Sequence, residues 1–164
     1  NQQKLVIGKW LAASAFALAG LALNLAGFTL VFERAGVLPP DGFSRVFLLW
    51  TVCGLVPLAL LGAALDLLAA ATCRTTKEAH VRLTIVTFVP MMVGMALIFS
   101  PGWVGRWWYA LPIVGQQALI GAGLRGDAVS AVQSVTLGLV TFVVAALALR
   151  AASRAFDRDE ILAA

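Results

Sequence analysis

The stretch Leu11–Phe32, LAASAFALAGLALNLAGFTLVF, contains no charged residue and decides the class of fold. A helix rises about 1.5 Å per residue, so roughly 20 apolar residues cross the hydrocarbon core of a bilayer. This stretch has 22 residues and is closed by Glu33, Arg34 and the helix-breaking run Gly36–Gly42. It is therefore predicted to be a transmembrane helix.

Three further stretches of the chain have the same character. Residues 46–73 carry one charge, Asp66; residues 83–105 carry none, and residues 128–149 are closed by Arg150. The sequence thus predicts an all-α, polytopic transmembrane helix bundle that forms a single domain over residues 1–164. The predicted spans are at about 11–32, 46–72, 83–101 and 128–150.

The composition excludes most other classes of protein. Hydrophobic residues make up 61% of the 164 residues and charged residues 12%, with a mean hydropathy of +0.93. Soluble domains contain about 25% charged residues, and disordered chains contain fewer apolar ones. The net charge of +4 is explained by the accumulation of Lys and Arg in cytoplasmic loops, without invoking nucleic acid.

The uncharged segment at about 107–124 differs from the four predicted spans. It contains Pro112 and the polar pair Gln116 and Gln117, and it begins among the aromatic residues of 103–109. Aromatic rings settle at the level of the lipid headgroups, and polar groups are costly in hydrocarbon. We expect a re-entrant or interfacial helical element here; a fifth full span is the alternative.

The distribution of basic residues predicts the orientation. Four spans place both termini on one side, and Lys and Arg concentrate in cytoplasmic segments. Both termini and the loop 73–82 are therefore expected in the cytoplasm. Eight basic residues lie on that side and four on the other: Lys4, Lys9, Arg74, Lys77, Arg82, Arg150, Arg154 and Arg158, against Arg34, Arg45, Arg106 and Arg125.

Asp66 is the only charge deep within a predicted span. Acids in spans are costly and usually face the bundle interior or a water-filled cavity, so Asp66 is a candidate for an ion or substrate pathway. The alternative is a structural acid paired with Arg74 or with a cation of a neighbouring helix. Asn24 and Gln133 can line the same route, or instead join helices through interhelical hydrogen bonds.

Neither a catalytic constellation nor a cofactor motif is found in the sequence. His80 is the single histidine, and no second ligand stands at metal-binding spacing from it. Gly8-Lys9 lacks the first glycine and the Ser or Thr of a phosphate loop. We therefore expect no enzymatic activity, no metal and no cofactor in this chain.

Four sections, in this order, resemble the C-terminal half of NatB-like permeases, a branch of the type-2 ABC export permeases. They are KLVIGK at Lys4–Lys9, TTKEA at Thr75–Ala79, LPIVGQ at Leu111–Gln116 and AFDRDEIL at Ala155–Leu162. The resemblance implies that the chain corresponds to spans three to six of a six-span subunit, as part of a larger permease. It also implies an extracellular re-entrant element before the last span.

The resemblance further implies export of Na⁺ or another small solute or drug across the plasma (inner) membrane. The expected partners are a cytoplasmic ATP-binding subunit, which would bind ATP and Mg²⁺, a second permease subunit and the lipid bilayer, but not nucleic acid. Residues Lys4, Lys9, Arg74, Lys77 and Glu78 are expected to face the ATPase, and Pro112, Gln116 and Gln117 to cap the outer end. A non-transporting membrane scaffold or assembly subunit is the alternative function.

Overall fold

The computed structural model describes residues 2–36, 45–73, 75–99, 111–125, 127 and 130–163. These residues form five helices joined by turns, with no strand among them. The helices are α1 (Gln2–Arg34), α2 (Arg45–Ala71), α3 (Thr76–Phe99), α4 (Val114–Leu124) and α5 (Ala131–Ala163). The predicted all-α class is confirmed.

Four of the helices, α1, α2, α3 and α5, are long and apolar enough to cross a membrane, as predicted. α1 and α5 are longer than the predicted spans, with 33 residues each. The reason is that the charged segments flanking the apolar runs contain Lys, Arg and Gln, which are good helix formers. The ends of the uncharged runs therefore do not mark the ends of the helices.

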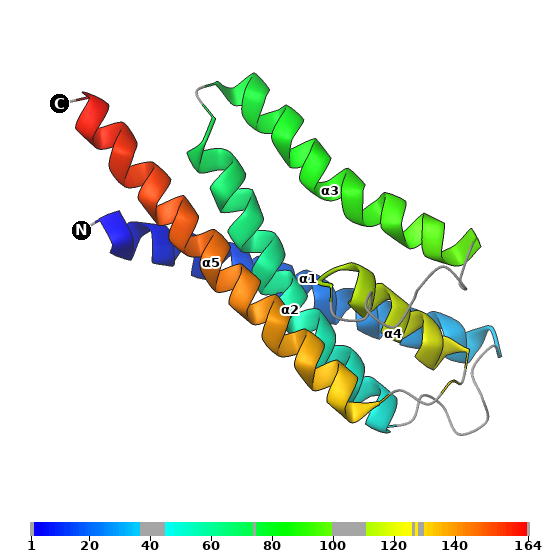
Figure 1. Ribbon diagram of the computed structural model, residues 1–164. Coiled ribbons are helices and arrows are strands. Elements are labelled where there is room, and N and C mark those ends of the chain that lie inside the picture. Colours follow the sequence, from blue (N-terminus) through cyan, green and yellow to red (C-terminus); the bar gives the residue numbers. More distant parts are fainter. Residues whose placement is uncertain are drawn as a thin grey trace.

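The first residues of α1 and the last residues of α5 lie at one end of the bundle (Figure 1). The Lys9 Nζ atom lies 5.7 Å from the centre of the Phe156 ring, which joins the two helices there. The end of α2 and the start of α3 also lie here, at the termini end of the bundle (Figure 1). The prediction that both termini lie on one side of the bundle agrees with this arrangement.

The most extensive contact in the bundle is between α2 and α5. α5 contributes a buried stripe in which most residues are small, and the close approach of two backbones depends on such residues. A Cβ atom added at Gly138 would lie 3.3 Å from the carbonyl oxygen of Cys53 in α2. The buried residues of the stripe are Ser134, Leu137, Thr141, Ala145, Ala148 and Ala152.

α1 and α3 lie outside this α2–α5 core. α1 is fixed to α2 by the indole N–H of Trp10, which donates to the carbonyl oxygen of Leu60 at 3.2 Å. α3 diverges from α2 toward the end opposite the termini, and α4 lies between them there (Figure 1). The bundle thus has a close-packed pair, α2 and α5, with the other helices around it.

The contact at Gly138 predicts that a larger side chain destabilises the protein. In Gly138→Val the new Cβ presses on the backbone of α2, and we expect a loss of about 1–3 kcal/mol in the free energy of unfolding. Gly20→Val in α1 is the matched control, because no atom lies within 4 Å of a Cβ at Gly20. Thermal unfolding of the purified protein measures both, and equal losses would contradict the close α2–α5 contact.

Candidate functional site

α4 begins about halfway along the bundle and runs toward the end opposite the termini. Its 11 residues span about 16 Å, too short to cross a hydrocarbon core of about 30 Å. Its first turn contacts Pro90 in α3 and Thr141 in α5. Each of these residues lies about ten residues, or roughly 15 Å, from the end of its helix that faces away from the termini.

α4 lies within the segment predicted to be a re-entrant or interfacial element, although the helix is shorter than that segment. It begins at Val114, because Pro112 and Ile113 form a tight turn before it. Residues 107–110 of the predicted element lie outside the described residues. The five-span alternative is not what the structure contains, since four helices have the length to cross a membrane among the described residues.

The turn before α4 has an unusual backbone conformation. Ile113 has φ 74° and ψ −62°, and the N–H of Val114 donates to the Pro112 carbonyl oxygen at 3.0 Å. These values define a γ-turn of the strained type, and a β-branched residue rarely adopts a positive φ. Such a conformation costs about 1–3 kcal/mol and persists only where neighbouring contacts fix it.

Gln116 provides the contacts that fix this turn. Its side-chain oxygen accepts the N–H of Ile113, and its Nε2 donates to the Thr141 hydroxyl at 2.6 Å. Thr141 in turn donates to the carbonyl oxygen of Leu137 at 2.7 Å. Gln116 is only 1% exposed, and its side chain lies beside Gly54 of α2. A buried polar chain therefore joins the turn before α4 to α5.

Gln117 joins α4 to α3 instead, because adjacent helical residues point about 100° apart. Its Nε2 donates to the carbonyl oxygen of Pro90 at 3.0 Å. Gly94 permits this approach, since a Cβ there would lie 3.4 Å from the amide. The Oε1 atom of Gln117 is buried without a hydrogen-bond partner among the described residues.

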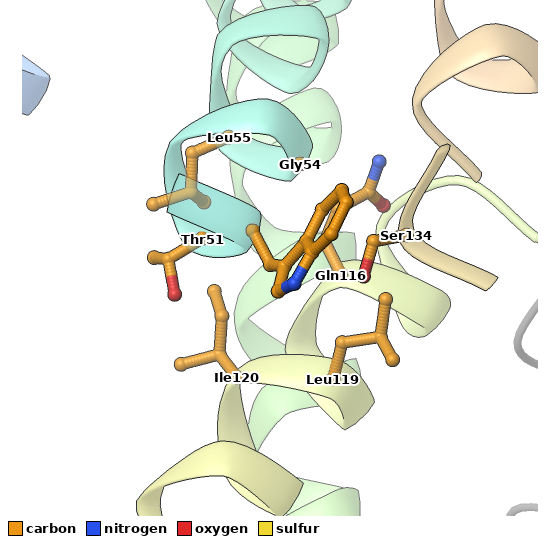
Figure 2. Close-up of a pocket in the computed structure, with 8 residues that line it drawn as sticks. Thr51, Gly54, Leu55, Gln116, Leu119, Ile120 and Ser134 are labelled. Carbon is orange, nitrogen blue, oxygen red and sulfur yellow. The ribbon is translucent and has the colours of Figure 1, made fainter. Parts of the chain in front are cut away.

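A small cavity lies beside Gln116, where α2, α4 and α5 meet (Figure 2). Its volume of about 20 Å³ is enough for a single water molecule. Thr51, Gln116 and Ser134 contribute polar groups to its wall. The remaining lining residues are Trp50, Gly54, Leu55, Leu119 and Ile120.

Asp66, Asn24 and Gln133, the predicted pathway residues, lie on three different helices and are all exposed. No hydrogen bond joins any two of them within the described part of the chain, and Asn24 donates to Gly20 of its own helix at 2.8 Å. Asp66 follows the buried Ala64 by two residues, which turns it about 200° away from that face. The structure does not bring these three residues into one site.

The residues predicted to face an ATPase lie at the termini end, except for Arg74, which is outside the described residues. Lys4, Lys9 and Lys77 are exposed. Glu78 forms an ion pair with Arg82 one turn along α3. These three exposed lysines thus lie at the end of the bundle where the sequence predicts the cytoplasm.

The partners of the two glutamines, Thr141 and Pro90, were not among the predicted site residues. The sequence does contain a signal for Thr141, which is one of a set of small residues spaced three, four or seven positions apart. This spacing is typical of a helix-packing stripe, and the residues are Ser134, Thr141, Ala145 and Ala148. No comparable signal pairs Pro90 with Gln117.

The polar chain through Gln116 predicts a large effect of removing it. Gln116→Leu leaves the Ile113 N–H without its side-chain acceptor, and we expect a loss of about 1–3 kcal/mol in the free energy of unfolding. Gln133→Leu, at an exposed position, is the matched control and should change stability by less than about 0.5 kcal/mol. Thr141→Val should lower stability too, and the double variant should lose less than the sum. Additive losses would show that the two side chains act separately.

Comparison with known proteins finds no match for this chain. The chain matches no protein-family model, no curated protein and no solved structure.

Proposed function

We propose that the chain is a membrane-spanning permease subunit of an ATP-driven exporter, forming part of the pathway for Na⁺ or another small solute or drug. The observation that carries this proposal is α4, a half-length helix that starts midway along the bundle after a half-buried, irregular turn. Irregular backbone at membrane depth is tolerated only where it is buried in protein or lines a water-filled cavity. Transporters commonly place such interrupted helices where solutes cross.

The order of the elements also supports this function. In the permeases that the sequence resembles, a re-entrant element stands before the last span, and α4 stands before α5. α3 has no buried residue, whereas α2 and α5 form the core, so α3 is the helix most easily displaced. Because α4 is tied to both α3 and α5, displacement of α3 would move or release α4.

In this proposal ATP is hydrolysed by a partner subunit and not by this chain. The partner would meet the termini end, where Lys4, Lys9 and Lys77 are exposed, and this end would face the cytoplasm of a cell with the protein in its plasma membrane. A second permease subunit would complete the pathway. An ATPase bound at one end and α4 at the other would give alternating access.

Purification of the tagged protein from cells that express its neighbouring genes tests the ATPase partner. We expect an ATPase to co-purify and its turnover to rise on assembly. Lys4→Glu combined with Lys77→Glu should reduce the co-purified ATPase by about tenfold, because the basic charge proposed to contact the ATPase is reversed. Arg34→Glu, exposed at the other end of α1, is the control and should leave it unchanged. Purification without any ATPase would favour the scaffold function.

Solute efflux from cells or vesicles tests Asp66 separately. If this carboxylate lies on the route, Asp66→Asn should slow efflux by about tenfold or more, since the charge that attracts or exchanges a cation is gone. Glu33→Gln, an exposed acid at the end of α1, is the control and should leave efflux unchanged. Unchanged efflux in Asp66→Asn would remove Asp66 from the pathway.

A further inference from the structure

α3 has an open hollow along one of its faces. None of the residues of α3, all of which the structure describes, is buried. The hollow has a volume of about 340 Å³. It is lined by His80, Leu83, Thr84, Thr87, Phe88 and Met91. These positions recur at spacings of three and four residues, so they form one face of the helix.

The length of the hollow matches half a bilayer. From His80 to Met91 it extends over 11 residues, or about 16 Å. Half of a hydrocarbon core is about 15 Å thick. The hollow starts near the termini end and stops one residue beyond Pro90, where Gln117 of α4 contacts α3. It therefore covers the leaflet on the side of the termini.

The wall of the hollow is mainly apolar. Thr84 donates its hydroxyl hydrogen to the His80 carbonyl oxygen at 2.8 Å, and Thr87 donates to the Leu83 carbonyl oxygen at 3.0 Å. With these hydrogens satisfied inside the helix, the two threonines do not require a polar ligand. Leu83, Phe88 and Met91 supply the rest of the wall, and Met adapts easily to a flexible ligand.

The end of the hollow at the membrane surface is polar and basic. His80 and Lys77 are both exposed there, one turn apart on α3. Arg82, another cation near this end of α3, forms an ion pair with Glu78. A ligand with an apolar chain and an anionic head would place the chain along α3 and the head near Lys77.

We propose that this hollow binds one acyl chain of an anionic phospholipid from the leaflet at the termini end, with the phosphate near Lys77 and His80. Bulk lipid is as apolar as the wall, so the selection comes from the headgroup charge and the shape of the hollow. The face contains no Gly or Ala, whereas the helix contact between α2 and α5 relies on such residues. A lipid chain therefore suits it better than the helix of a second copy. The two proposals share Lys77, but the lipid binding itself requires no ATPase.

Native mass spectrometry of the purified protein, delipidated and then given phosphatidylglycerol or phosphatidylcholine, tests the proposal. We expect phosphatidylglycerol to be retained about tenfold better than phosphatidylcholine, and Thr87→Trp to lower its retention by about tenfold because the indole fills the hollow. Val89→Trp is the matched control: it is exposed at the same depth but points about 200° away, and should retain the lipid.

Lys77→Gln provides a measurement that does not depend on filling the hollow. It should remove most of the preference for phosphatidylglycerol while phosphatidylcholine retention stays the same. Equal retention of the two lipids by the unchanged protein would overturn the proposal, as would equal retention by Thr87→Trp and Val89→Trp. A dimer that retains no lipid and becomes a monomer in Thr87→Trp would also overturn it, since a second copy would then fill the hollow. None of these measurements involves an ATPase. A negative result would therefore overturn the lipid site without bearing on the proposed exporter function.

Discussion

Backbone groups at membrane depth need hydrogen-bond partners, because the hydrocarbon offers none. The four long helices pair their backbone groups within each helix. α4 instead starts in the middle of the bundle, after a turn at Ile113 that needs a side chain to pair its backbone N–H. The side chain of Gln116 accepts the N–H of Ile113 and is itself held by Thr141. The half-length helix, its place between α3 and α5 and the function proposed for it all depend on this one buried amide.

Two neighbouring glutamines divide the contacts of α4 between a core helix and a peripheral one. Gln116 contacts α5, which is packed closely on α2, whereas Gln117 contacts α3, whose residues are all at least partly exposed. The buried Oε1 of Gln117 has no partner among the described residues, so this contact is the less completely satisfied of the two. Unsatisfied buried groups lower local stability. α4 is therefore held more firmly on the side of α5.

The sequence predicted the four spans and the short element between the last two, because uncharged length alone distinguishes a full crossing from a partial one. It singled out Gln116 as an unusual residue, since a polar pair beside a proline is costly in an apolar run. It did not predict the faces on which Asp66, Asn24 and Gln133 lie. Polarity indicates that a residue is costly in a membrane, but the direction of its side chain depends on which helices are neighbours. For the same reason the sequence did not predict that the small residues of α5 form the most extensive helix contact, with α2.

The contact between Gln116 and Thr141 also constrains the biosynthesis of the protein. α4 precedes α5 in the chain, yet Gln116, which fixes the turn before α4, is held by the hydroxyl of Thr141 in the middle of α5. An 11-residue segment is too short to be inserted as a spanning helix in its own right. α4 therefore reaches its final position only after α5 has been synthesised and has entered the membrane. Assembly of this half of the bundle thus ends, rather than begins, with α4.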